Sequence, residues 1–124
     1  MKQLDTKGAY RFIDELFDNN LIGDGTYQCA ADIIQLCDKD EENDPDGEFL
    51  AELVAMSEEQ LADWRREDII DWKEDLSEEE WLDRFEIGED KAFRSIDQLI
   101  QCTDWQFILT ELLPKFVSTE EVSS

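Results

Sequence analysis

The sequence contains no histidine, which removes the commonest general base, a common zinc ligand and every histidine-containing catalytic triad. It also lacks the GxxxxGK[ST] and GxGxxG motifs that bind phosphates and dinucleotides. Carboxylates are so frequent that no particular pair indicates the acid and base of a glycosidase. We therefore expect a protein without catalytic residues, without a metal site and without a cofactor.

Cysteine is scarce, and Cys29, Cys37 and Cys102 form no CxxC pair. An odd number argues against a closed disulfide framework and fits a reducing compartment. Cys29 and Cys37 lie eight residues apart on one expected helix, a rise of about 12 Å that is too long for a disulfide. We expect buried structural thiols, with a contact between Cys102 and either of the other two left open.

Long apolar runs are also missing. No run approaches the ~20 residues that a membrane-spanning helix needs, and the first residues do not resemble a secretory signal. We therefore expect a cytoplasmic protein.

Basic residues are few, since 11 Lys and Arg stand against 34 Asp and Glu and give a formal net charge of −23. Direct binding of nucleic acid needs a cluster of basic residues, and anionic membranes repel an acidic chain. Solubility of a small domain needs a net charge of only about 2 to 8. The expected partner is therefore a basic protein, above all one that itself holds a phosphate backbone, rather than nucleic acid or a membrane.

The chain is nevertheless rich enough in apolar residues to fold. Hydrophobic residues make up 41% of its 124 residues and include four Trp and seven Phe, unlike a disordered acidic tail. This length is typical of one domain with its own core. We expect a single helical domain over residues 1–117 and a frayed C-terminal tail over residues 118–124.

Apolar residues recur at helical spacing along the chain, and no segment shows convincing β alternation. The first expected helix is stopped by Gly23 and Gly25, the second is capped by Thr26, and the third follows the turn residues 43–47. Two more are expected to begin at Ser57 and at Ser77. A further helix is expected to begin near Asp90, with Phe93 in the core, and the last to begin at Thr103 and to be disturbed by Pro114. Gly88 is expected to end the Ser77 helix. The predicted fold is all-α, a compact single-domain bundle of six or seven short helices with a strongly acidic surface.

Three of these helix starts fit the S/T-x-x-E/Q capping box, in which the hydroxyl accepts from a backbone amide and the Glu or Gln reaches back. They are the segments 57–60, 77–80 and 103–106.

The acidic residues are concentrated in the middle of the chain. Residues 38–90 contain 23 acids and five bases, whereas the remaining residues contain 11 acids and six bases. Within the two middle helices the apolar positions predict one buried face each, formed by Leu61, Ile69, Trp72, Trp81, Leu82 and Phe85. The opposite faces carry carboxylates three or four residues apart, which repel one another unless a partner neutralises them.

These rows of carboxylates resemble the successive phosphates of one nucleic-acid strand. Ile70 and Ile87 are expected to project from or beside them, as apolar anchors of a specific interface. The predicted partner-binding residues are Glu59, Asp63, Glu67, Ile70, Glu74, Glu79, Asp83 and Glu86. The alternative interpretation is an acidic face that is only solvated.

Two further patterns have a structural interpretation. The tryptophans lie on or near apolar stripes and are expected in the core, with Trp64, at the edge of its stripe, the best candidate for an exposed anchor. Residues 42–48 resemble the first half of a calcium loop, but Leu53 stands where the bidentate Glu belongs, so we interpret them as an acidic turn.

In composition, size and helical character the chain is similar to the acidic anti-restriction and anti-CRISPR proteins of phages and mobile elements. That resemblance implies a stoichiometric, non-enzymatic inhibitor, a DNA mimic that fills the basic channel of a restriction enzyme, a CRISPR complex or another nucleic-acid-processing enzyme. The alternatives are an immunity or antitoxin protein that neutralises a basic toxin such as a nuclease, and an adaptor or chaperone for basic proteins. A calcium buffer ranks behind these.

Overall fold

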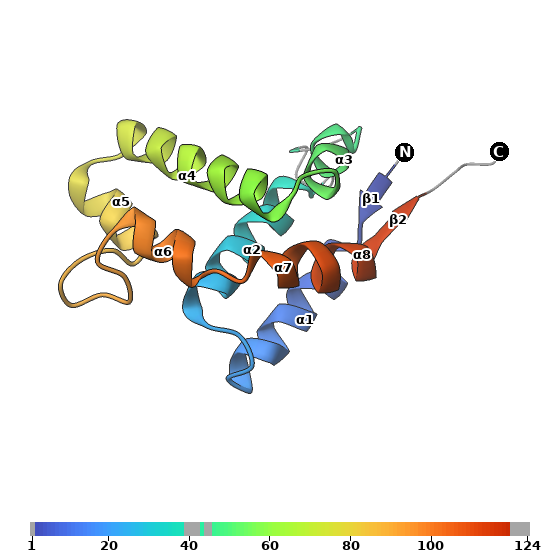
Figure 1. Ribbon diagram of the computed structural model, residues 1–124, viewed down its shortest axis with the longest axis horizontal. Helices are drawn as coiled ribbons and strands as arrows, with labels where there is room; N and C mark the ends of the chain where they lie inside the picture. The colour runs from blue at the N-terminus through green and yellow to red at the C-terminus, as the bar shows by residue number, and fades with distance from the viewer. Residues whose placement is uncertain (1, 39–42, 44–45, 120–124) are drawn as a thin grey trace.

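The computed structural model describes residues 2–38, 43 and 46–119, and it is mostly helical (Figure 1), as the sequence predicts. The helices are α1 (Thr6–Asp18), α2 (Asp24–Leu36), α3 (Glu48–Val54), α4 (Glu58–Asp75), α5 (Glu78–Arg84), α6 (Ile96–Cys102), α7 (Trp105–Phe107) and α8 (Leu113–Phe116), with a π-helical turn over Ile108–Leu112 between the last two. Two short strands, β1 (Lys2–Leu4) and β2 (Val117–Thr119), complete the described elements.

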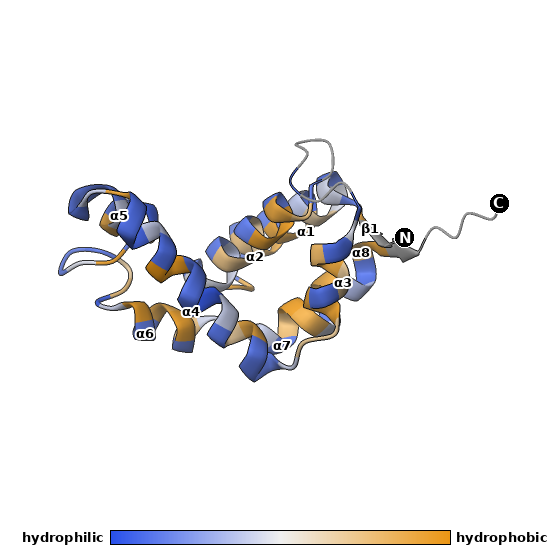
Figure 2. Cartoon of the chain, turned by 90° about the horizontal axis from the view of Figure 1, so that it is seen from above, coloured by the Kyte–Doolittle hydropathy of each residue, from blue (hydrophilic) through white to orange (hydrophobic). Residues whose placement is uncertain are grey.

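The helices share one core of apolar side chains. α1 packs against α2 and α8, α2 contacts α6, and the long helix α4 contacts α5, α6 and α7. Fully buried core residues from these elements include Ile13, Ile33, Leu61, Leu99 and Ile108. Hydrophilic residues predominate along α4 and α5 (Figure 2). No helix of the described residues is both long and apolar enough to cross a membrane.

The two ends of the described chain lie side by side, because β1 pairs with β2 in antiparallel register, Leu4 opposite Val117 (Figure 1). This pairing is absent from the sequence prediction, since three residues are too few for alternation to be recognised. The boundary predicted after residue 117 falls inside β2, and residues 120–124 lie outside the described part.

Side-chain caps fix the starts of both acidic helices. The Ser57 hydroxyl accepts from the Gln60 amide at 3.2 Å, and the Gln60 side chain accepts from the Ser57 amide at 2.9 Å, which is the predicted capping box. The Ser77 hydroxyl accepts from the Glu80 amide at 3.3 Å. These two helix starts are confirmed.

The predicted caps at Thr26 and Thr103 are wrong. Gly23 precedes α2, and the buried Thr26 hydroxyl accepts instead from the Asp104 amide at 2.9 Å. Asp104 itself caps α7, while the Thr103 hydroxyl donates to the Leu99 carbonyl at the end of α6. Both threonines are buried at the junction of α2 and α6, where their hydroxyls bond to backbone groups of neighbouring segments.

The segment between α5 and α6 also differs from the prediction. α5 ends at Arg84 rather than at Gly88, and α6 begins at Ile96, capped by Ser95, rather than near Asp90. The Phe93 amide donates to the Glu86 carbonyl at 2.9 Å, and the Gly88 amide donates to the Phe93 carbonyl at 2.8 Å. These bonds close a loop that buries Phe93, so its place in the core is confirmed, although it lies outside any helix.

The last helix is disturbed before Pro114, as predicted. Proline has no amide hydrogen and its ring crowds the carbonyl four residues earlier, so the preceding turn widens into the π-helical turn Ile108–Leu112. The apolar side of this segment is retained, since Ile108, Leu112 and Leu113 are buried.

All three cysteines are free thiols. Cys29 and Cys37 are buried on α2 and its C-cap, as expected, whereas Cys102 is exposed, so the expectation of a buried thiol is wrong there. Residues 42, 44 and 45 of the acidic turn over residues 42–48 lie outside the described residues. Within the described ranges, no group of carboxylates and thiols is arranged to hold a metal ion.

Candidate partner-binding site

Five predicted partner-binding residues form one line along the solvent face of α4. Glu59, Asp63, Glu67, Ile70 and Glu74 follow the spacing i, i+4, i+8, i+11 and i+15, and all five are exposed. At a rise of 1.5 Å per residue this line is about 22 Å long, with neighbouring carboxylates about 6 Å apart at the four-residue steps. We call these five residues the α4 row.

The cations of α4 do not neutralise this row. Arg65 points into the protein, Arg66 pairs with Asp97 of α6 at 3.0 Å, and the Lys73 ammonium lies 5.0 Å from the centre of the Trp81 ring. None of the four row carboxylates makes an ion pair with a described Lys or Arg. Like charges four residues apart destabilise a helix, so the row costs stability that no described cation repays.

The Arg65 guanidinium is buried, with no exposed surface, among ionic and aromatic groups. It donates to Asp32 of α2 at 2.5 Å and to Asp68 at 2.6 Å, and it lies 5.2 Å from the Phe85 ring centre. Arg84 at the end of α5 donates to the other oxygen of Asp32 at 2.6 Å. This cluster therefore joins α2, α4 and α5, and its role is to position the acidic helices.

Burial also shifts the protonation of groups around this cluster. It raises the pKa of the Cys29 thiol, so that Cys29 remains a neutral thiol at neutral pH. It also raises the pKa of the Asp68 carboxyl, a shift that the Arg65 guanidinium opposes.

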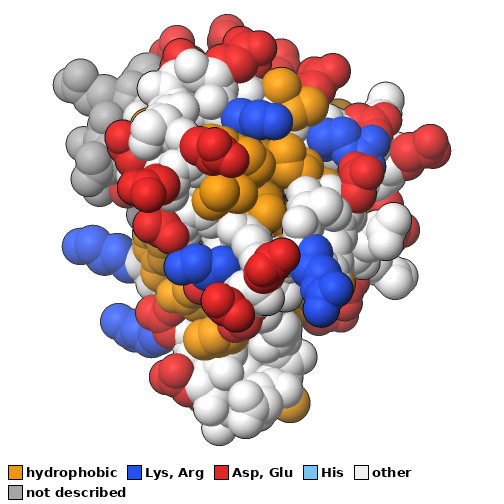
Figure 3. All heavy atoms as spheres, turned by 90° about the vertical axis from the view of Figure 1, so that its left-hand side faces the viewer, with side chains coloured by type: hydrophobic (Ala, Val, Ile, Leu, Met, Phe, Trp, Pro, Cys, Tyr) orange, Lys and Arg blue, Asp and Glu red, His pale blue; other side chains and the backbone are white. Residues whose placement is uncertain are grey.

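Ile70 of the α4 row also lines an apolar groove of about 420 Å³. Ile70 is 42% exposed, so it projects into solvent as predicted. The groove is lined by Arg66, Ile70, Trp81, Leu82, Ile87, Arg94, Ser95, Ile96 and Asp97. Figure 3 shows hydrophobic side chains gathered on the face where α5 and α6 lie, with charged side chains around them.

Ile87, the second predicted anchor, is only 4% exposed, so that prediction is wrong. The bonds that close the 86–93 loop form a bridge between Ile87 and Phe93 and turn both side chains into the core. The prediction assumed that the Ser77 helix continued to Gly88, and it fails because the helix ends earlier.

The structure places only two of the three carboxylates predicted as a row on α5 on that helix. Glu79 is exposed, and Asp83 is exposed but pairs with Lys91 at 3.0 Å. Glu86 is not on the helix, because it follows the C-cap residue Phe85 and adopts a left-handed backbone conformation with φ 55°. Such a conformation is uncommon for a residue other than glycine. Glu86 is exposed, as predicted, but it is directed by the turn rather than by a helical face.

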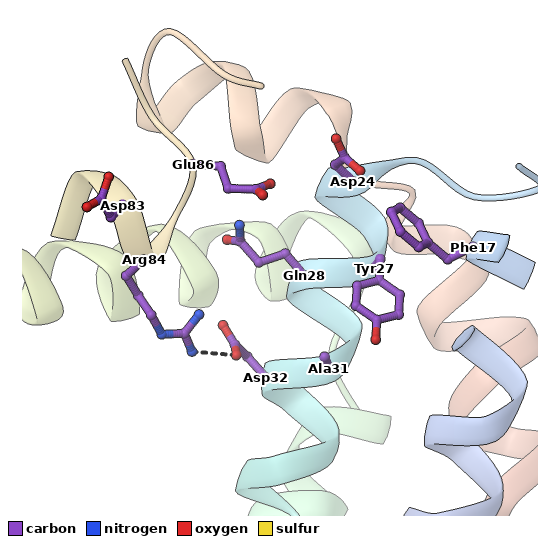
Figure 4. A pocket seen from close by; sticks show the side chains of 9 residues that line it. All are labelled: Phe17, Asp24, Tyr27, Gln28, Ala31, Asp32, Asp83, Arg84 and Glu86. Atoms are coloured by element: carbon purple, nitrogen blue, oxygen red, sulfur yellow. Dashed lines mark hydrogen bonds and ion pairs between the residues drawn. The ribbon is translucent and has the colours of Figure 1, made fainter. Parts of the chain in front are cut away.

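Asp83 and Glu86 line a cavity of about 360 Å³ between α2 and the end of α5 (Figure 4). We call this space the α2 cavity; its other lining residues are Phe17, Asp24, Tyr27, Gln28, Ala31, Asp32 and Arg84. The sequence prediction missed all seven, because they come from α1, α2 and α5 and no local pattern joins them. Asp24, an acidic residue in the first turn of α2, was the one signal in the sequence that could have indicated this cavity.

The Tyr27 ring packs on Phe17, with the ring centres 4.7 Å apart. Its hydroxyl donates to the Asp14 carboxylate, and this hydrogen bond raises the pKa of Tyr27 to about 12, with burial as a smaller cause. Tyr27 is therefore a neutral aromatic wall of the α2 cavity throughout the physiological range.

Two tryptophans differ from expectation. Trp72 was expected in the core, but it is 39% exposed, with the Arg84 guanidinium 5.4 Å from its ring centre. Trp64, the expected exposed anchor, is half-buried against Phe49 at 5.4 Å between ring centres. The apolar stripe of α4 is therefore covered at Trp64, whereas Trp72 contacts Phe85 at 6.3 Å between ring centres and keeps part of its ring in solvent.

No known protein family, no curated protein and no solved structure matches this chain.

Proposed function

We propose that this protein is a non-enzymatic, stoichiometric inhibitor whose strongly acidic surface imitates nucleic acid and blocks a basic nucleic-acid-binding channel. The observation that carries the proposal is the α4 row. Its four carboxylates are exposed along about 22 Å of helix, while the three cations of the same helix are occupied elsewhere. A solvated surface helix normally interleaves its charges. The targets are host defence complexes of the CRISPR or restriction type and other nucleic-acid-processing enzymes.

The row suits a partner that normally holds phosphates. One nucleic-acid strand presents a charge about every 3.4 Å along the axis. The row presents Glu59, Asp63 and Glu67 about 6 Å apart and Glu74 about 10 Å further along the helix. Lys and Arg side chains are long enough to accommodate that difference. Ile70 adds an apolar contact within the charged line, which would favour a protein surface over a simple counterion atmosphere.

The experiment is an affinity capture from host lysate with three immobilised proteins. They are the wild type, the row variant Glu59→Gln/Asp63→Asn/Glu67→Gln, and the control Glu15→Gln/Asp18→Asn/Glu111→Gln. Both variants lose three negative charges, and all the substituted residues are exposed. We expect the wild type and the control to retain one dominant nucleic-acid-binding protein that duplex DNA or RNA elutes, and the row variant to lose it.

The purified target then tests inhibition directly. Its activity should fall to zero at a defined molar ratio of inhibitor, and binding should weaken as salt rises from about 50 to about 300 mM, because screening shortens the reach of the charges. Equal loss in both variants would mean that only the total charge matters. A broad set of ribosomal and other basic proteins would replace the proposal with the adaptor function.

The groove beside Ile70 favours the immunity or antitoxin alternative as a second candidate. An immunity protein needs a smaller patch with apolar contacts at its centre, and the groove supplies apolar walls next to the α4 row. This candidate predicts that the captured protein is a single nuclease toxin and that Ile70→Asp weakens binding more than the loss of any one row carboxylate.

A further inference from the structure

We propose that the α2 cavity is a pocket for one arginine side chain of the basic partner. The inference rests on the proposed function for the partner's charge, and it adds a defined anchoring site to a surface otherwise described only by its charge. The α2 cavity has a volume of about 360 Å³, which lies at the lower end of the range for small-ligand sites and suits a single side chain.

The charge of the pocket favours a cation. Asp24 at the start of α2 and Glu86 after α5 both line it, and neither pairs with a Lys or Arg in the part of the chain that the structure describes. The remaining carboxylates, Asp32 and Asp83, are bonded to Arg84 and Lys91. Two carboxylates from different elements are therefore available to an incoming guanidinium.

Gln28 provides an independent indication of a missing donor. Its Oε1 atom is buried and has no hydrogen-bond partner. Figure 4 shows the side-chain amide directed into the cavity, between Glu86 and Asp32. Buried acceptors are almost always satisfied in folded proteins. Because this oxygen is out of reach of solvent while Gln28 as a whole is only half-buried, a rotation of its side chain would bring the oxygen to an N–H group in the cavity.

The shape of the donor set distinguishes arginine from lysine. The guanidinium has five N–H donors in one plane, so it can bond two carboxylates and an amide oxygen at once, and its flat face stacks on aromatic rings. Phe17 and Tyr27 supply an aromatic wall of the cavity on the side of α1. Arg84 donates to one oxygen of Asp32 at the opposite side, so this part of the protein already accommodates one guanidinium.

The test uses the purified full chain and needs no knowledge of the target. A short peptide, acetyl-Gly-Arg-Gly-amide, is titrated into ¹⁵N-labelled protein while backbone and side-chain amide shifts are recorded. We expect saturable shifts at Asp24, at Glu86 and at the Gln28 side-chain amide, and weaker binding of the matching lysine peptide. Asp24→Asn/Glu86→Gln should weaken the arginine peptide by about tenfold or more, because both charge-assisted hydrogen bonds are lost.

The matched control is Glu15→Gln/Glu111→Gln, which has the same net charge and should retain full affinity. Shifts spread evenly over all acidic faces, equal losses in the pocket variant and the control, or lysine binding as tight as arginine would each overturn the arginine pocket. The row variant should still bind the peptide. Peptide binding without target capture would refute the proposed function alone, whereas target capture without peptide binding would refute the pocket alone.

Discussion

The guanidinium of Arg65 on α4 is joined to the carboxylate of Asp32 on α2 by an ion pair of 2.5 Å, and Arg65 is fully buried. Arg84 occupies the second oxygen of Asp32, so one carboxylate connects three helices. The charges that this strongly acidic chain buries therefore hold the acidic helices in place, while the charges of the α4 row lie in solvent.

The substitution Arg65→Met is expected to lower the free energy of unfolding by about 3 kcal/mol or more. It removes the buried positive charge that pairs with the carboxylates of Asp32 and Asp68. The control is Arg66→Met, which removes a half-exposed guanidinium paired with an exposed Asp97 and should cost less than about 1 kcal/mol. Urea unfolding measures both. Similar losses in the two variants would contradict a structural role for the buried cluster.

The position of Arg65 shows how far the sequence could be interpreted. Leu61, Arg65 and Ile69 are four residues apart and are the three buried residues of α4. The helical period therefore puts Arg65 in the apolar stripe, a signal that the sequence prediction did not use. Its partner Asp32 is 33 residues away on another helix, and no local pattern indicates such a pair. The exposed face of α4 followed from the same period and was predicted correctly.

The helix caps show the same division between local and distant information. The Ser57 box was predictable because both hydrogen bonds lie within four residues. Thr103 failed because its hydroxyl is buried and bonds to the preceding helix. Ser95 and Gln98 have the same spacing as the Ser57 box, and their sequence signal was available although it was missed. The α2 cavity could not be predicted, because it forms where α1 and α2 meet the end of α5, which is distant from them in sequence.

The Ser57 cap gives a second prediction. Ser57→Ala is expected to lower the free energy of unfolding by about 1 kcal/mol, because the Gln60 amide loses its acceptor at the start of the longest helix. Ser57→Gly should cost only a few tenths of a kcal/mol, since glycine leaves the cap open to water. The midpoint of urea unfolding distinguishes them. Equal stability of the alanine variant and the wild type would mean that tertiary packing alone fixes the start of α4.

The hydrogen bond between Tyr27 and Asp14 predicts a dependence on alkaline pH. The pKa of Tyr27 is about 12 in the folded protein, against the ordinary value of 10.0, so the folded state retains a proton that the unfolded state loses between these values. The stabilisation is fully present below pH 10 and is lost as the pH rises through 12. Unfolding of the wild type and of Tyr27→Phe should therefore converge over this window. A constant difference in stability would contradict the raised pKa.

Glu86 combines backbone strain with the proposed arginine site, and this gives the last prediction. A residue with a Cβ atom in the left-handed region costs about 1–2 kcal/mol, and glycine removes that cost while adding about 0.4–1 kcal/mol of unfolded-chain entropy. Glu86→Gly should therefore raise the free energy of unfolding by up to about 1 kcal/mol, whereas Glu86→Gln, which keeps the Cβ atom and loses the same charge, should leave it nearly unchanged. Both variants should bind the arginine peptide more weakly, because both lack the carboxylate. Urea unfolding and the peptide titration measure the two effects separately. A glycine variant that is more stable and binds the peptide as tightly as the wild type would show that the strain serves some purpose other than placing this carboxylate in the α2 cavity.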